Sequence, residues 1–159
     1  MAGCATGVVL RTFRDHKGGV FSIDLSPDGK QIASASSDKT VKLWDLESGT
    51  LSRTLRGHTQ SVYSVAFALD SELLISGGND HVMIVWDSKN GTELRKLNGH
   101  SANIVSLSIN PNGTQVASGS SDETIKIWDI ESGTCVQTIK GHHLGVTSVR
   151  FNHDGTRLA

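Results

Sequence analysis

The sequence predicts an all-β fold, and two features carry that prediction. The first is a repeat, because four histidines follow one another at intervals of 42 residues: His16, His58, His100 and His142. The second is a strand pattern, since apolar side chains recur with period two after each histidine and no segment shows a helical period. A repeat of this length built from short strands indicates stacked copies of one small β-unit.

Other residues keep the same interval and give each unit a common frame. No insertion or deletion separates the copies, so every unit is expected to have the same strands and turns. The markers are Asp38, Asp80 and Asp122; the pairs Trp44-Asp45, Trp86-Asp87 and Trp128-Asp129; and Gly49, Gly91 and Gly133.

Each unit is predicted to hold four short strands joined by turns. Pro and Gly mark the turn after the first strand, as in Ser26–Gly29, because Pro presets φ and Gly accepts a positive φ. The second unit has Ala68–Ser71 there, so its hairpin is less sharply predicted. The expected strands are Val20–Leu25, Val62–Phe67, Ile104–Ile109 and Val146–Phe151; then Gln31–Ser36, Leu73–Gly77 and Gln115–Gly119; then Thr40–Trp44, Val82–Trp86 and Thr124–Trp128; and a fourth such as Leu51–Leu55.

A sheet of four short strands cannot bury both of its faces alone. Stacking such sheets radially covers the faces and leaves only short edges, which is the principle of a β-propeller. The residues Gly57-His58, Asp80 and Trp86-Asp87, with their copies, resemble the WD-repeat family. The resemblance covers almost the whole chain and implies a partial WD-repeat β-propeller.

The expected organisation is about three and a half four-stranded blades of a seven-bladed ring. The blades would span 16–57, 58–99 and 100–141, with the start of a fourth at 142–159. Val8–Phe13 aligns with Leu51–Leu55 and is expected to be the fourth strand of a preceding blade. A seven-bladed ring needs roughly 300 residues at this repeat length. Three interpretations stay open: a truncated chain, a half-propeller completed by a second copy, and an open array.

The family resemblance also implies a hydrogen-bonded tetrad in each blade. Indole N–H can only donate, hydroxyl and imidazole can donate and accept, and carboxylate accepts, so the four groups can satisfy one another. The first unit has Asp15-His16 where the others have Gly-His, so its loop is expected to be built differently. Carried over by position, the tetrads are His16, Ser34, Asp38, Trp44; His58, Ser76, Asp80, Trp86; and His100, Ser118, Asp122, Trp128.

Composition excludes several function classes. The formal net charge of −1 gives no basic excess for direct nucleic-acid binding, and no segment has the length of a membrane span. Two cysteines, Cys4 and Cys135, fit a reducing compartment, and no secretory signal is visible. We therefore predict a cytoplasmic or nuclear protein with no cofactor.

Two patterns invite a catalytic or metal-binding interpretation. Ser34, His16 and Asp38 carry the groups of a hydrolytic triad, but the same trio recurs in every unit, whereas an enzyme needs one site. His142, His143 and His153 form the one local histidine cluster, and it lacks a known ligand spacing. We predict neither a catalytic residue nor a metal site.

A binding surface is expected where the first strand leaves the preceding loop, next to the turn before the tetrad Asp. In WD-repeat proteins this end faces the ligand-binding surface, and here its residues vary between units while the frame does not. Phe21 and Tyr63 are aromatic anchors of the kind enriched at binding hot spots, although their parity also fits packing between blades. The candidate surface is Phe21, Tyr63, Val105, Thr147, Ser61, Asn103, Ser37, Asn79 and Ser121.

These observations favour a non-catalytic interaction scaffold that presents one propeller face to peptides or proteins, with self-association possible to complete the ring. The alternative is a propeller subunit of a nuclear RNA- or chromatin-associated complex. A small-molecule-binding or enzymatic propeller ranks lower, since it would need a unique cluster of titratable groups.

Overall fold

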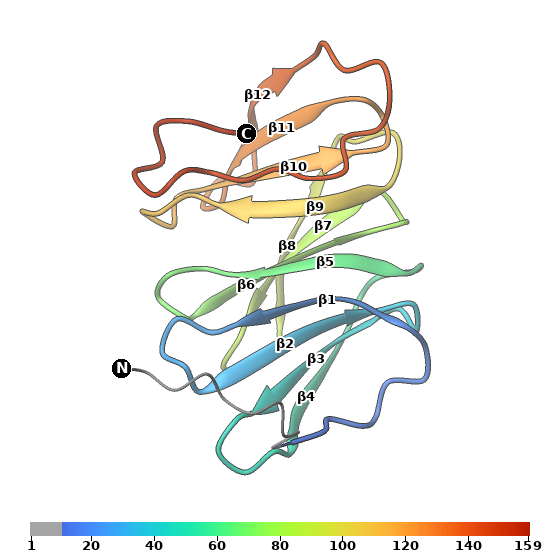
Figure 1. The fold of residues 1–159 in the computed structure, drawn as a ribbon, viewed down its shortest axis with the longest axis vertical. Helices are drawn as coiled ribbons and strands as arrows, with labels where there is room; N and C mark the ends of the chain where they lie inside the picture. The colour runs from blue at the N-terminus through green and yellow to red at the C-terminus, as the bar shows by residue number, and fades with distance from the viewer. Residues whose placement is uncertain (1–10) are drawn as a thin grey trace, which may run out of the picture.

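The computed structural model describes residues 11–159, and it confirms the all-β prediction. Three four-stranded antiparallel sheets follow one another along the chain (Figure 1). We call them the first, second and third blades. Their strands are β1 (Val20–Leu25), β2 (Gln31–Ser36), β3 (Thr40–Asp45) and β4 (Leu51–Arg56); β5 (Val62–Phe67), β6 (Leu73–Gly78), β7 (Val82–Asp87) and β8 (Glu93–Asn98); β9 (Ile104–Ile109), β10 (Gln115–Ser120), β11 (Ile125–Asp129) and β12 (Cys135–Ile139).

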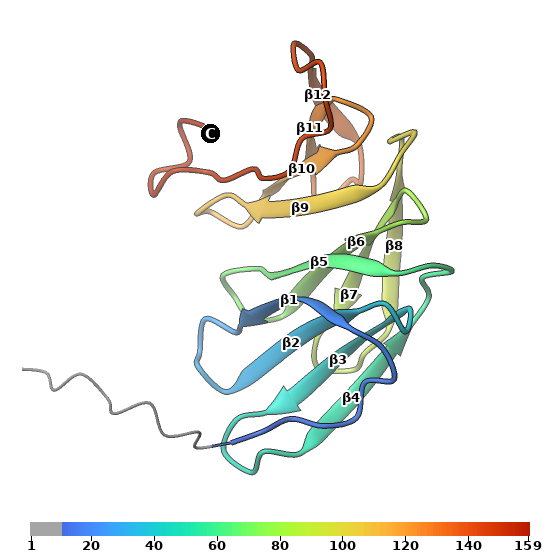
Figure 2. The ribbon, with the colours of Figure 1, turned by 45° about the vertical axis from the view of Figure 1, so that its right-hand side comes forward.

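The blades stack through their first strands. Strand β5 contacts β1 on one side and β9 on the other. Both views show β1, β5 and β9 in succession, with the remaining strands of each blade receding from them (Figures 1 and 2). This arrangement puts the turns before the tetrad aspartates at one end of the array and the turns between first and second strands at the other.

The core lies between blades rather than inside one. Because each strand alternates its side chains, both faces of the middle sheet are apolar and each meets a neighbouring blade. At the first junction, Ala33, Val41 and Leu43 of the first blade pack against Val65 and Phe67 of the second, all at most 6% exposed. A second cluster joins the second and third blades in the same way.

Polar side chains also link neighbouring first strands. The Ser64 hydroxyl accepts a hydrogen bond from the Leu107 N–H at 3.1 Å, and the Ser106 hydroxyl accepts one from Val149 N–H at 3.0 Å. An Asp24 carboxylate oxygen accepts from Phe67 N–H at 2.7 Å. Ser64 and Ser106, two of the serines that recur at this position, therefore each provide an acceptor for the next blade, besides being small.

The hairpin between β5 and β6 forms despite its unusual turn. Ser71 takes a φ of 59° at the place where the other turns have Gly29 and Gly113, with φ of 71° and 74°. A left-handed residue is therefore required by the turn itself, and serine adopts it at a cost that glycine avoids. The Asp70 carboxylate supports the turn by accepting the Glu72 N–H at 2.8 Å.

Two predicted strands are not formed as expected. Arg11–Phe13 has no strand hydrogen bonding, and the rest of the expected strand, 8–10, lies outside the described residues, as does Cys4. The third strands that the structure describes are already paired with their own fourth strands, so none is left to pair with this segment. Val146–Phe151 has one isolated bridge, Phe151 to Leu158, because only Arg157–Ala159 follows its turn as a partner.

Arg11 and Phe13 nevertheless occupy the place of a fourth strand. Arg11 lies against Gly49 as Arg53 lies against Gly91, one repeat further on. The Phe13 ring packs on the Trp44 indole with centroids 5.5 Å apart. The segment therefore covers the first blade in the way that β4 covers the second.

Candidate binding face and its polar relay

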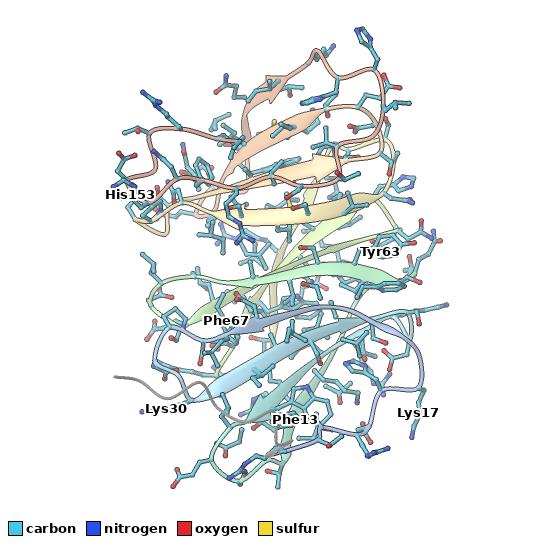
Figure 3. All side chains as sticks on the ribbon, viewed as in Figure 1. Phe13, Lys17, Lys30, Tyr63, Phe67 and His153 are labelled. Atoms are coloured by element: carbon cyan, nitrogen blue, oxygen red, sulfur yellow. The ribbon has the colours of Figure 1, made fainter. Side chains whose placement is uncertain are left out.

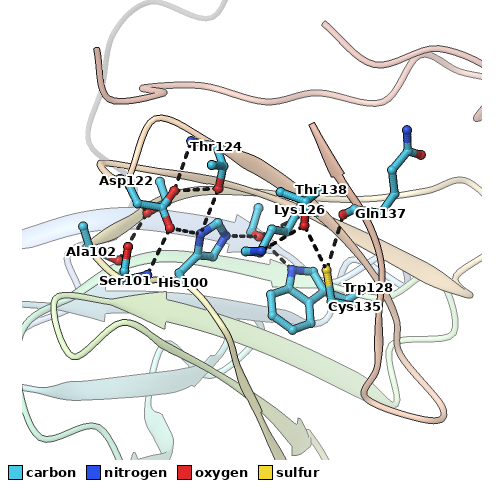
Figure 4. Close-up of polar contacts among 12 residues, drawn as sticks. His100, Ser101, Ala102, Asp122, Thr124, Lys126, Trp128, Cys135, Gln137 and Thr138 are labelled. Atoms are coloured by element: carbon cyan, nitrogen blue, oxygen red, sulfur yellow. Dashed lines mark hydrogen bonds and ion pairs between the residues drawn. The ribbon is translucent and has the colours of Figure 1, made fainter. Parts of the chain in front are cut away.

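A four-residue relay runs through each blade, and the third blade shows it in full (Figure 4). The Trp128 indole N–H donates to the Ser118 hydroxyl at 2.8 Å. That hydroxyl lies 2.7 Å from His100 Nε2, and His100 Nδ1 lies 2.7 Å from an Asp122 carboxylate oxygen. All four groups are satisfied when Ser118 donates to Nε2 and Nδ1–H donates to the carboxylate.

The other two blades repeat this geometry closely. The Trp44 and Trp86 indole nitrogens lie 2.8 Å from the hydroxyls of Ser34 and Ser76. The corresponding His–Ser distances are 2.7 and 2.8 Å, and the shortest His–Asp distances are 2.8 and 2.9 Å. Among residues 11–159, no buried side-chain nitrogen or oxygen is left without a hydrogen-bond partner. The members are His16, Ser34, Asp38, Trp44, His58, Ser76, Asp80 and Trp86.

The relay aspartates are held as carboxylates. Burial alone would raise the pKa of Asp122, but hydrogen bonds from the Thr124 hydroxyl, His100 and Ser101 N–H outweigh it and leave the pKa below its usual range. The pKa of Asp38 is lowered in the same way by Thr40, Lys17 and His16. Burial lowers the pKa of His100, although Asp122 opposes the shift, so the neutral imidazole is favoured.

The relay fixes the loop before each first strand to the turn beside it. Each aspartate accepts a backbone N–H from the residue after the histidine, as in Asp38 with Lys17 at 2.9 Å and Asp122 with Ser101 at 3.0 Å. The relay serines are at most 4% exposed, and each is engaged by an indole and an imidazole. Hydroxyls so placed are inaccessible to a substrate, so the trio positions backbone rather than offering a nucleophile.

The first blade departs from the others through an ion pair between a buried lysine and an exposed aspartate. The Lys42 ammonium on β3 pairs with the Asp15 carboxylate and donates to the Thr54 hydroxyl at 3.0 Å. In the second blade, Gly57 and Ile84 stand at those positions, and a Cβ on Gly57 would lie 2.8 Å from the Trp86 ring. The third blade keeps the lysine as Lys126 but has Gly99 in place of Asp15, and the Lys126 ammonium donates to the Thr138 hydroxyl at 2.9 Å. Asp15 is therefore the residue that distinguishes the first blade.

The candidate binding face lies at the relay end of the array, where Lys17 and Tyr63 are labelled in Figure 3. A hollow of about 390 Å³ is lined by Phe21, Tyr63, Asn103 and Val105. The Phe21 and Tyr63 rings meet edge-on with centroids 5.0 Å apart, across the junction between the first and second blades.

Phe21 is 55% exposed, so it is not simply packed between blades. A β-bulge at Val20–Ser22 interrupts the alternation of β1, and a similar bulge lies at Val62–Ser64 in β5. Ile23 has the same parity and is 68% exposed, so both side chains lie outside the packed face of the first blade.

The remaining residues of the candidate face surround this hollow without lining it. One backbone hydrogen bond recurs three times: Ser37, Asn79 and Ser121 donate their N–H groups to the carbonyls of Gly19, Ser61 and Asn103 at 2.8–2.9 Å. The Asn79 side-chain amide also donates to the side-chain oxygen Oε1 of Gln60 at 2.7 Å. Thr147 is exposed on the segment after β12. Backbone hydrogen bonds thus hold Ser37, Ser61, Asn79 and Ser121 in place; Ser121 is exposed and the other three are partly buried.

Within the described range, no group of three His, Cys, Asp or Glu residues could hold a metal ion, and His142, His143 and His153 are exposed. In the same range, no helix has the length and apolarity needed to cross a bilayer.

Sheets stacked through their first strands, with a relay at one end, define part of a β-propeller. The family model for the WD domain, G-beta repeat (WD40), matches residues 7–45, 49–87, 91–129 and 133–159. The chain therefore belongs to the WD40 repeat family. The matches at 49–87 and 91–129 each begin just before a fourth strand and end with the third strand of the next blade, so each of these two straddles two sheets.

Solved structures and curated proteins agree with this assignment. The structure of U3-55K aligns with a TM-score of 0.85 and 25% identity over 88% of this chain and 45% of that one. The crystal structure of RRP9 WD40 repeats aligns with a TM-score of 0.85 and 26% identity over 88% and 44%.

Shorter matches occur in longer curated proteins. The Notchless protein homolog of Arabidopsis thaliana is 50% identical over 40 residues, which is 25% of this chain and 8% of that protein. Eukaryotic translation initiation factor 3 subunit I of Aspergillus niger is 38% identical over 45 residues, 28% and 13% respectively. The chain thus spans less than half of the matched solved structures and a small part of the curated relatives.

Proposed function

We propose that this protein is a non-catalytic interaction scaffold that binds a peptide or protein segment at the relay end of its blades. One observation carries the proposal. Three buried relays hold the same backbone geometry at this end, while the side chains that reach the hollow differ: Phe21, Tyr63 and Val105 occupy one repeated position. A constant frame with variable exposed residues is suited to recognition.

The symmetric repetition of the polar sites among residues 11–159 supports a scaffold over an enzyme. Each Ser–His–Asp trio recurs in every blade and is buried, whereas catalysis needs one accessible nucleophile. The hollow adds two aromatic rings and an amide, a combination that supports contact area and hydrogen bonding rather than bond cleavage. We also propose a cytoplasmic or nuclear location.

Panning a random peptide display library on the immobilised chain tests the proposal. We expect enriched peptides to lose at least tenfold in affinity for the double variant Phe21→Ala/Tyr63→Ala, because aromatic anchors carry much of the energy of a small interface. Val136→Ala, at an exposed position on β12, is the matched control and should bind as the original chain does. Equal binding by the double variant would remove this face from consideration.

A second candidate is a propeller subunit of a nuclear RNA- or chromatin-associated complex, favoured by the structural likeness to U3-55K and to RRP9. The net charge of −1 opposes direct contact with nucleic acid, so the chain would act through proteins there. Retention on a polyanion column that weakens with salt would instead support direct contact. Light scattering tests the related proposal that two copies associate, for which a doubled mass is the expected result.

A further inference from the structure

A second groove lies between the second and third blades, at the end opposite the relay. It has a volume of about 280 Å³. Three partly or fully buried aliphatic side chains, Leu73, Val85 and Ile130, form much of its lining, and Leu94 on β8 is 46% exposed beside them. The other lining residues are Arg95, Gly113, Thr114, Asp129 and Glu131.

The corresponding place at the junction between the first and second blades is polar. One repeat earlier, Glu72 and Lys89 stand where Thr114 and Glu131 stand here. Their carboxylate and ammonium are 2.5 Å apart, and they line a small polar hollow with Gln31, Ser71 and Ser88. An ion pair within the second blade and polar side chains from both blades therefore line the first junction at its surface.

The second junction has exchanged those polar groups for apolar ones. Leu73 replaces Gln31, Leu94 replaces Ser52, and Ile130 replaces Ser88. The third blade has no counterpart of the Glu72–Lys89 ion pair, since Thr114 carries no charge and Glu131 reverses the sign of Lys89. The result is a groove with aliphatic side chains in its lining, where the counterpart at the first junction is a smaller polar hollow of about 150 Å³.

The rim of the groove carries a negative excess. Backbone and hydroxyl hydrogen bonds from Ser132 lower the pKa of Asp129, which therefore stays ionised. Glu131 is exposed and forms no ion pair within residues 11–159. The one cation of the lining, Arg95, donates to the Ile130 carbonyl oxygen at 3.0 Å and lies inside the junction. Two carboxylates against one guanidinium favour a cationic group on whatever enters.

We propose that this groove is a second docking site, which binds an extended segment of a partner protein carrying a leucine-like side chain close to a lysine or arginine. The aliphatic chain covers Leu73, Leu94 and Ile130, and the basic group pairs with Glu131 and Asp129 at the rim. The site is separate from the hollow at Phe21 and Tyr63, so the chain can hold two segments at opposite ends.

The matched first junction supplies the test. The double variant Thr114→Glu/Glu131→Lys recreates the Glu72–Lys89 ion pair on the third-blade wall of the groove, using two exposed positions that leave the core untouched. The probe is a random heptapeptide display library panned on the full chain, followed by titration of the enriched peptides. We expect peptides that combine an aliphatic and a basic residue, and at least a tenfold loss of their affinity for the double variant.

Two further variants keep the outcome unambiguous. Leu94→Ser, which installs the residue of the first junction, should also weaken binding while the melting temperature stays unchanged. Phe21→Ala/Tyr63→Ala should leave these peptides bound. The proposal is overturned if no aliphatic–basic peptides are enriched, or if enriched peptides bind Thr114→Glu/Glu131→Lys and Leu94→Ser within twofold of the original chain. Loss of binding only with Phe21→Ala/Tyr63→Ala supports the relay-end function and rejects this groove.

Discussion

The first strands of the first and second blades have nearly the same pattern and opposite surroundings. Ile23 of β1 is 68% exposed, whereas Val65 at the same position of β5 is 5% exposed. Leu25 and Phe67 differ likewise, at 53% and 6%. The second and third strands of the first blade cover β5, while no described sheet lies against the outer face of β1. Apolar alternation therefore shows that a strand face can be buried, but the face is buried only where a neighbouring blade covers it.

The largest expected effect on stability comes from truncating Phe67, which lies on the covered strand β5. Phe67→Ala should lower the free energy of unfolding by about 3–5 kcal/mol, because it leaves a cavity between two blades. Leu25→Ala should change it by no more than about 0.5 kcal/mol, as for other exposed positions. Urea denaturation followed by tryptophan fluorescence measures both. Similar losses for the two variants would mean that β1 is covered in solution.

A middle-sized effect is expected from the relay of the second blade. Ser76→Ala removes the hydroxyl that joins Trp86 and His58, and leaves a buried indole N–H and an imidazole nitrogen unpaired. We expect a loss of about 1–3 kcal/mol from such an unsatisfied group. Ser52→Ala, at an exposed position on β4, is the control and should be near neutral. A neutral Ser76→Ala would show that the relay orders loops without stabilising the blade.

The smallest expected effect is the pH dependence of stability that His100 causes. The pKa of His100 is lowered in the folded chain, so the unfolded chain binds more protons as the pH falls below about 6.5. Stability is therefore complete above that pH and is lost on acidification, by at most about 1.4 kcal/mol per pH unit for one proton. Denaturation midpoints between pH 7 and 5 measure the slope. His100→Gln should flatten it, while the exposed His142→Gln should not.

Local sequence signals accounted for the strands where a complete partner strand follows. The interval of 42 residues and the Trp-Asp markers placed three sheets, and parity placed the apolar faces between them. The same signals predicted a strand at Val146–Phe151, where the structure has only a bridge to Leu158. A strand exists through its ladder, so a pattern alone cannot create one without a partner.

By itself, the sequence determined the repeat, the strand faces and the set of groups able to form a relay, because these depend on residue type and spacing. Tertiary structure alone decided the exposure of β1, the Asp15–Lys42 ion pair, the contact between the Phe21 and Tyr63 rings, and the groove at Leu94. Each of these depends on atoms from segments far apart along the chain. Their contacts exist only after the blades stack, and no local periodicity encodes them.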